Sequence, residues 1–157
     1  MNTDETIESL SHGFNLIEDH VIITDPNGHI LYANDAVEKN TGFSRSEILG
    51  KTPGQLWGGL MPKEFYEKMW HKIKIEKQFF VADVQNLRKD QTKYWQRLHI
   101  TPILNAAGEV VYFLGIEPNI TKWKEAEGFT QEFSSVMGQQ QSDPKQTLNS
   151  VSAWLNK

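Results

Sequence analysis

The sequence predicts an α+β fold, because two β-strands are followed by several helices and then by three more strands. Runs of β-branched and aromatic residues between turn residues indicate the strands. Apolar residues that recur every three or four positions indicate the helices. A regular alternation of strands and helices would instead predict a parallel α/β sheet. With 157 residues, the chain is expected to form one domain with helical extensions.

The N-terminal part is expected to form a helix and then a β-hairpin. Apolar residues over 1–17 recur at helical spacing: Ile7, Leu10, Phe14 and Ile17. Strands are predicted at 21–24 and 29–33, on either side of the turn 25–28. The turn ends in Gly28, which supplies the positive φ that such turns need.

Helix caps place the next elements. Asn34 is expected to cap a helix over 35–41, which ends at Gly42. Ser44 and Glu47 have the spacing of a capping box, in which each side chain bonds the backbone N–H of the other residue. A second, short helix is therefore expected to start after Ser44.

Residues 52–60 are interpreted as a loop, because Pro53 and three glycines fall there. Pro62 suits the first turn of a longer helix, in which Phe65, Met69 and Ile73 form an apolar stripe. Three antiparallel strands complete the prediction: 79–87, 94–104 and 110–117.

Composition excludes several classes of function. A net charge of −4 argues against nucleic acid as a partner, because phosphate binding needs a basic surface. No apolar run is long enough to span a bilayer, and the acidic N-terminus lacks the features of a signal peptide, so a cytoplasmic protein without membrane contact is expected. The absence of Cys excludes disulfides and thiolate chemistry. No catalytic motif is present, so no enzyme activity is expected.

Six fragments, in this order, resemble the PAS domain family: 22–34, 41–44, 48–51, 86–90, 100–103 and 113–121. The resemblance implies a five-stranded antiparallel sheet with helices on one face, which encloses a small pocket. It also implies a positive φ at Gln91, in the turn between the third and fourth strands, because the family usually has Gly there. PAS domains sense ligands, light or redox state, or dimerise, and they pass the signal through flanking helices. The predicted domain covers 18–121, between an N-terminal amphipathic helix at 1–17 and a C-terminal signalling and dimerisation segment at 122–157.

The resemblance extends to flavin-binding light-oxygen-voltage domains, in which polar side chains on the inner strands face the flavin. Asn86, Gln96 and Glu117 match these positions, and Leu98 shares the face of Gln96 because strand residues alternate. Trp57 stands where that subfamily has a Gln. Two interpretations remain open: a small polar ligand held by these side chains, or a filled core in which the polar groups bond one another. The second is favoured.

Neither flavin nor haem is expected as a cofactor. Pro53 occupies the position of the reactive Cys of light-oxygen-voltage domains, and Trp57 is expected to fill the space of a flavin ring. Some PAS domains bind haem through a His on the long helix, where this chain has His71. That residue lies among charged side chains and is expected to face solvent, paired with Glu67. No histidines have metal-ligand spacing, so no metal site is expected.

The opposite face of the predicted sheet carries large apolar side chains that need cover: Trp95, Tyr112, Leu114 and Ile116. Either the N-terminal helix covers them, or they form a homodimer interface.

The segment 129–138 resembles the start of a histidine-kinase dimerisation helix. In that family a phospho-accepting His follows, where this chain has Gln139, and a Pro comes five positions later, here Pro144. Gln cannot accept a phosphoryl group, so no autophosphorylation is expected. A degenerate kinase remnant is preferred over a merely amphipathic helix.

The resulting functional hypothesis is a sensory and dimerisation module of a sensor-kinase-like two-component system. A state change would pass through the junction Asn119, Ile120 and Thr121 into an output helix. Parallel homodimerisation, as a coiled coil, is expected through an apolar stripe: Trp123, Phe129, Phe133, Val136 and Met137. The alternatives are a helix folded back on its own sheet, a PAS sensor with a ligand or cofactor, and a catalytically dead kinase fragment that acts as a scaffold.

Overall fold

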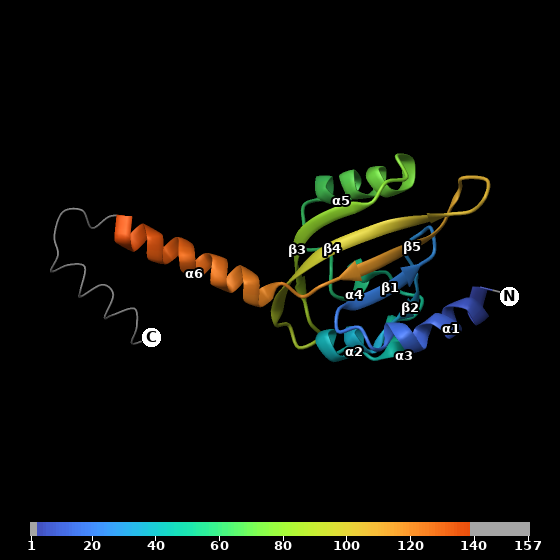
Figure 1. The fold of residues 1–157 in the computed structure, drawn as a ribbon, viewed down its shortest axis with the longest axis horizontal. Helices are drawn as coiled ribbons and strands as arrows, with labels where there is room; N and C mark the ends of the chain where they lie inside the picture. Colours follow the sequence, from blue (N-terminus) through green and yellow to red (C-terminus); the bar gives the residue numbers. More distant parts are fainter. Residues whose placement is uncertain (1–2, 139–157) are drawn as a thin grey trace. The chain divides into compact units, whose positions relative to one another are not determined.

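Five antiparallel strands form one sheet in the order β2-β1-β5-β4-β3 (Figure 1). The computed structural model describes residues 3–138. The strands are β1 (His20–Thr24), β2 (Ile30–Ala33), β3 (Phe80–Leu87), β4 (Lys93–Leu104) and β5 (Val110–Glu117). Each begins and ends within one residue of its predicted bounds. The predicted α+β fold is therefore confirmed.

One helix precedes the hairpin, short helices connect the hairpin to the meander, and a longer helix follows β5. They are α1 (Thr3–Phe14), α2 (Asp35–Thr41), α3 (Arg45–Ile48), α4 (Pro53–Leu56), α5 (Lys63–Trp70), the π-helical turn η1 (His71–Ile75) and α6 (Thr121–Gly138). The loop predicted at 52–60 is wrong in part, because α4 lies within it. Pro53 takes the first helical position, and the backbone N–H of Thr52 donates to Gln55 Oε1 at 2.9 Å.

Asn34 does not cap α2 with its side chain, although it occupies the N-cap position. Its Oδ1 accepts from the backbone N–H of Val21 at 3.0 Å. Its Nδ2 donates to the carbonyls of Phe14, Ile17 and Asp19 at 2.9, 3.1 and 2.9 Å. The predicted cap is therefore wrong. The buried amide instead joins the end of α1 and the chain after it to the first strand through backbone groups.

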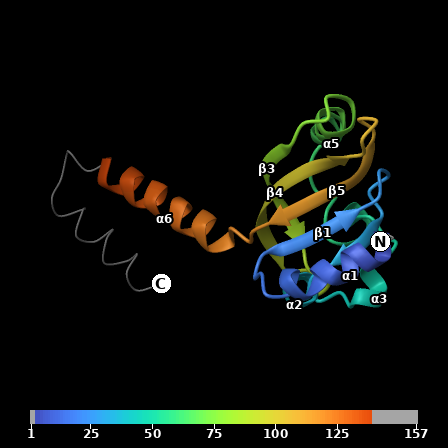
Figure 2. The ribbon, with the colours of Figure 1, turned by 45° about the vertical axis from the view of Figure 1, so that its right-hand side comes forward.

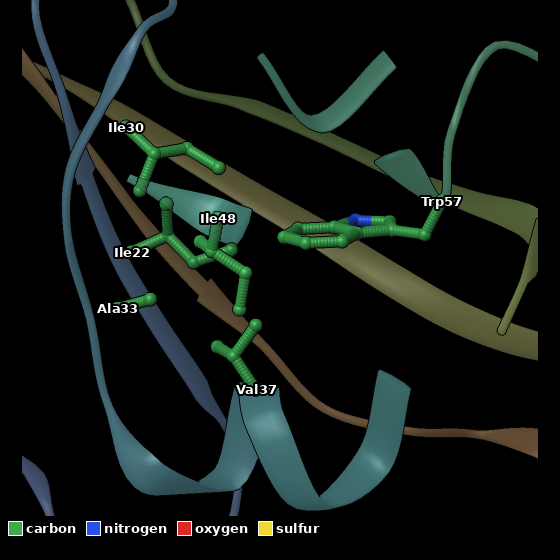
Figure 3. Close-up of a cluster of buried hydrophobic side chains, with 6 residues drawn as sticks. All are labelled: Ile22, Ile30, Ala33, Val37, Ile48 and Trp57. Carbon is green, nitrogen blue, oxygen red and sulfur yellow. The ribbon is translucent and has the colours of Figure 1, made fainter. Parts of the chain in front are cut away.

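The inner face of the sheet buries two apolar clusters under the helices. The first joins β1, β2, α2, α3 and the end of α4, as Figure 3 shows: Ile22, Ile30, Ala33, Val37, Ile48 and Trp57. The second joins α5, η1 and β5 through Met69, Ile73 and Phe113. Packing on both clusters fixes the helices on this face, since helices this short are unstable alone.

The outer face is contacted by α1 near β2. Phe14 packs on the ring of Tyr32, with 5.8 Å between ring centroids, and Tyr32 Oη donates to Asn15 Oδ1 at 3.2 Å. In Figure 2, α1 lies beside β1 and β2. Ile116 of β5 is exposed on this face. Trp95, Tyr112 and Leu114 are half-buried.

Residues 121–138 form a separate compact unit and are described here by themselves. Trp123, Phe129, Phe133 and Met137 of α6 are exposed, and the rings of Phe129 and Phe133 stack with centroids 6.5 Å apart. The predicted phospho-acceptor position Gln139, Pro144 and the rest of 139–157 lie outside the described residues. Within 3–138, no helix is both long and apolar enough to cross a membrane.

Candidate functional site

A cavity of about 240 Å³ lies between the two apolar clusters on the inner face of the sheet. That is the space of roughly eight water molecules at ~30 Å³ each. Most of its wall is apolar, and four aromatic side chains contribute to it: Trp57, Tyr66, Trp70 and Phe113. The core is therefore not completely filled by side chains, in contrast to the favoured interpretation of the sequence.

Four of the five predicted pocket residues line this cavity: Trp57, Asn86, Leu98 and Glu117. Gln96 does not line it, although it is fully buried and bonds both Asn86 and the Glu117 carbonyl. Pro53 also lines the cavity. Trp57 is almost fully buried and belongs to the first apolar cluster, yet it leaves the cavity open.

Gln96 is the centre of a buried hydrogen-bond network. Its Oε1 accepts from Asn86 Nδ2 at 2.8 Å. Its Nε2 donates to the backbone carbonyl of Glu117 at 3.1 Å and lies 2.7 Å from His20 Nδ1. One amide therefore connects two cavity-lining residues from β3 and β5 with the start of β1.

His20 is a site residue that the sequence analysis missed. It precedes the strand predicted at 21–24, but it opens β1 and is completely buried, with its ring edge-on to those of Trp57 and Tyr94 at 6.4 and 6.3 Å between centroids. The alternation of β1 was a usable signal, because Ile22 and Thr24 point inward and His20 has the same phase.

The His20 ring is neutral in this environment. Burial, with a smaller contribution from the charge of Arg88, lowers its pKa to about 4. Since Nδ1 accepts from the Gln96 amide, the proton is assigned to Nε2. His20 Nε2 and Tyr94 Oη have no hydrogen-bond partner among residues 3–138, and burial raises the pKa of Tyr94. Two unsatisfied polar atoms thus lie beside the network.

Glu117 places a carboxyl group at the cavity wall. Burial raises the pKa of this carboxyl to about 7. The side chain folds over Gly115, where an added Cβ would lie 2.8 Å from Glu117 Oε1. Glycine at this position therefore makes room for the carboxyl. Among the residues that line the cavity there is no Lys, Arg or His.

The end of β5 stays attached to β4 beyond Glu117. The backbone N–H of Arg97 donates to the Pro118 carbonyl at 3.0 Å, and that of Ile120 donates to the Trp95 carbonyl at 2.8 Å. Between them, Gln96 and Asn119 form an antiparallel bridge. Of the predicted junction, Asn119 and Ile120 therefore continue the pairing with β4, and Thr121 begins α6.

The other predicted positions lie away from the cavity. His71 is exposed as expected, but its Nε2 lies 3.6 Å from Glu76, whereas Glu67 pairs with Lys63 at 3.2 Å. The helical spacing of Glu67 and His71 is kept, since the backbone N–H of His71 bonds the Glu67 carbonyl, but the two side chains pair with other residues. Within residues 3–138, no group of His, Asp and Glu side chains has the arrangement of a metal site.

Comparison with known proteins finds relatives that are named as regulators, photoreceptors and kinases. It is 32% identical to a nitrogen fixation regulatory protein of Klebsiella oxytoca over 101 residues, which are 64% of this chain and 20% of that protein. It is 36% identical to a blue-light photoreceptor of Listeria monocytogenes over 110 residues, 68% of this chain and 43% of that protein. A blue-light-activated histidine kinase of Erythrobacter litoralis is 33% identical over 104 residues, 64% of this chain and 29% of that protein. The chain thus spans less than half the length of each.

Solved structures support the fold. An RNA-binding light-oxygen-voltage receptor superposes with a TM-score of 0.72 at 22% identity, over 86% of this chain and 39% of that one. A PAS domain from Colwellia psychrerythraea superposes with a TM-score of 0.65 at 21% identity, over 74% of this chain and 98% of that one. The model of a PAS domain family matches residues 18–122. The chain belongs to the PAS domain family.

Proposed function

We propose that this chain is a sensory module in which occupancy of the cavity is relayed to α6. One observation carries the proposal: Gln96 bonds the cavity-lining Asn86 through its side chain, and its backbone pairs with Asn119, two residues before α6. The relatives are regulators and photoreceptors by name, which supports a signalling role. Catalysis by this chain itself is not part of the proposal.

The relay works through a hydrogen bond that a ligand competes for. A ligand that draws the Asn86 amide or the Glu117 side chain toward itself disturbs the bonds that Gln96 makes with Asn86 and with the Glu117 carbonyl, and leaving the buried Gln96 Oε1 unpaired costs about 1–3 kcal/mol. The Gln96 side chain then reorients, which weakens its bond to the Glu117 carbonyl. The ligand shifts the equilibrium between the original and the altered conformation of the junction by as much as its affinities for these two conformations differ.

A filled cavity tests the relay without a known ligand. Val84→Phe adds a ring to the cavity wall, and hydrogen exchange at the Ile120 amide, which bonds the Trp95 carbonyl, reports on the junction. We expect Val84→Phe to change this exchange rate, and the change to disappear in the background Gln96→Leu. Gln85→Leu, on the half-buried outer side of β3, is the matched control for Gln96→Leu. In this background Val84→Phe should still change the exchange rate at Ile120. An unchanged rate in Val84→Phe would contradict the relay.

Dimerisation through α6 is the proposed output. Four large apolar side chains of this helix are exposed, and a second copy would cover them by symmetry: Trp123, Phe129, Phe133 and Met137. Val136, half-buried, completes the predicted stripe. Light scattering should give a dimer mass that Phe133→Glu reduces to the monomer, and a monomer mass for the unchanged chain would rule this output out. Membership of a two-component system, with Gln139 in place of a phospho-acceptor, belongs to the same proposal.

The proposal does not include a flavin, although several relatives are blue-light receptors by name. Trp57 forms part of the cavity wall, and about 240 Å³ is smaller than the ~300 Å³ at which pockets for drug-sized ligands begin. The absence of Cys also excludes a cysteinyl photoadduct. The purified protein should be colourless, and a stoichiometric flavin or haem absorbance band would overturn this part.

A further inference from the structure

We infer that the cavity takes a small organic cation, an amine or ammonium group on an apolar or aromatic body, whose charge pairs with the Glu117 carboxylate. The inference names a ligand class for the proposed sensory site and rests on that proposal. Its basis is a lone carboxyl at the wall of an otherwise apolar and aromatic cavity.

Among residues 3–138, no positively charged side chain lines the cavity with the carboxyl of Glu117, and this side chain is almost fully buried. A buried charge without a partner is costly, so a ligand that supplies the opposite charge gains affinity from the pairing. The glycine at 115 leaves the space in which this carboxyl lies, and a side chain there would displace it.

The titratable groups around Glu117 are already engaged or neutral. His20 of β1 is neutral and meets the Gln96 amide. Tyr94 of β4 stays protonated, because burial raises its pKa. Arg88, after β3, lies over the Tyr94 ring and donates to the Asn40 carbonyl at 2.8 Å.

On the helical side, Tyr66 of α5 accepts from the backbone N–H groups of Gly59 and Met61. Lys74 Nζ lies 4.9 Å from the ring centroid of Trp70, so this cation is held at an aromatic wall residue. None of these groups neutralises the carboxylate.

The aromatic wall selects the body of the ligand. Trp57, Tyr66, Trp70 and Phe113 all line the cavity, and cations are attracted to the faces of such rings. A cavity of about 240 Å³ has room for a body on the order of ten non-hydrogen atoms. A fully hydrated inorganic cation would meet apolar walls that cannot replace its water, whereas an aromatic amine buries its body against them. An anion would be repelled by Glu117.

Binding of a cation is coupled to the ionisation of Glu117. Because burial raises the pKa of the free carboxyl to about 7, the carboxylate that pairs with the ligand is abundant above pH 7 and scarce below it. Affinity for a cation should therefore fall as the pH is lowered from 8 to 6, by up to about tenfold for each unit below the pKa. A neutral ligand that accepts a hydrogen bond from the protonated acid would show the opposite dependence.

Calorimetry with three probes of similar shape tests the inference: benzylammonium, benzyl alcohol and phenylacetate. We expect the unchanged protein to bind benzylammonium best, and Glu117→Gln to weaken that binding about tenfold or more while leaving benzyl alcohol unaffected. Gly115→Ala, which displaces the carboxyl without removing it, should also weaken benzylammonium selectively. Glu18→Gln, at an exposed position before β1, is the matched control and should change nothing.

Three outcomes would overturn the inference: no binding of benzylammonium, equal or tighter binding of benzyl alcohol or phenylacetate, or benzylammonium binding that strengthens as the pH falls. Hydrogen exchange at Ile120 separates this failure from that of the relay. If benzyl alcohol binds best and changes the exchange rate, the inference of a cationic ligand is overturned and the relay stands. If benzylammonium binds through Glu117 but leaves the exchange rate unchanged, the inference of a cationic ligand is supported and the relay is contradicted.

Discussion

Two buried amides, Asn34 and Gln96, differ in how completely their surroundings are satisfied. Asn34 bonds only backbone groups: one N–H, of Val21, and three carbonyls. Gln96 bonds the side chains of Asn86 and His20 and one carbonyl. Around Asn34 no buried side-chain atom is left over, whereas His20 Nε2 and Tyr94 Oη, near Gln96, lack partners among residues 3–138.

This difference indicates that Asn34 has a structural role and Gln96 a functional one. A fully satisfied buried polar group stabilises one arrangement of the backbone and gains nothing from a ligand. A partly satisfied network beside a cavity is less stable than it would be with partners for every atom, and a ligand or a proton can supply them. Residues around Asn34 should therefore control folding, and those around Gln96 should control binding and pH dependence.

The largest expected effect is on the Asn34 side. Asn34→Ala leaves the buried Val21 N–H without its partner and removes the bonds to three carbonyls, so the free energy of unfolding should fall by about 3–5 kcal/mol. Urea denaturation measures it. Asn27→Ala, at an exposed turn position, should stay within about 0.5 kcal/mol. A loss below about 1 kcal/mol at Asn34 would remove the contrast between the two amides.

The next effect concerns Glu117 and pH. Its folded pKa, about 7, lies above the usual 4.5, so the folded state holds the proton more tightly, and ionisation destabilises it increasingly from pH 4.5 to 7. Glu117→Gln should raise the free energy of unfolding at pH 8 by up to about 3 kcal/mol and leave it nearly unchanged at pH 4. Urea melts across this range measure it. Equal differences at both pH values would show that the carboxyl is not desolvated.

His20 should have the opposite dependence, of somewhat smaller size. Its folded pKa, about 4, lies below the usual 6.5, so stability from this group is lost as the pH falls from 6.5 toward 4. As the pH falls from 6.5 to 4.5, His20 should lower the free energy of unfolding of the unchanged protein by about 2–3 kcal/mol. His20→Phe should remove this loss, so that the gain in stability from protonation of Glu117 becomes visible. The readout is the slope of stability against pH, with His29→Phe at an exposed position as control. An unchanged slope would mean that His20 is protonated in the folded state.

The smallest expected effect is at Gln91, a surface amide. It extends the comparison of the two buried amides to a position at which burial plays no part. Gln91 has a φ of 70°, as the sequence predicts, where glycine carries no steric penalty. Gln91→Gly should stabilise the fold by about 1 kcal/mol and raise the melting temperature. Calorimetry measures the shift, with Gln55→Gly, in the short helix α4, expected to lower it. A lower melting temperature for Gln91→Gly would show that its side chain contributes more than its backbone strain costs.

Local sequence patterns determined the elements and the inward-facing positions. The alternation of β-branched residues predicted the strands to within one residue, and the family resemblance predicted the positive φ of Gln91. The same alternation, with the family resemblance, selected Asn86, Leu98 and Glu117 for the cavity wall. These predictions succeed because turn propensity and strand alternation depend on residues a few positions apart.

Only the tertiary structure decided which buried polar groups meet, and which remain unsatisfied. His20 meets Gln96 across 76 positions of the sequence, and Asn34 leaves its cap for backbone groups 13 to 20 positions earlier. The space beside Trp57 likewise depends on how the two apolar clusters pack against each other. No local pattern encodes these contacts, because a buried polar side chain bonds the partners that packing of the whole domain brings within reach.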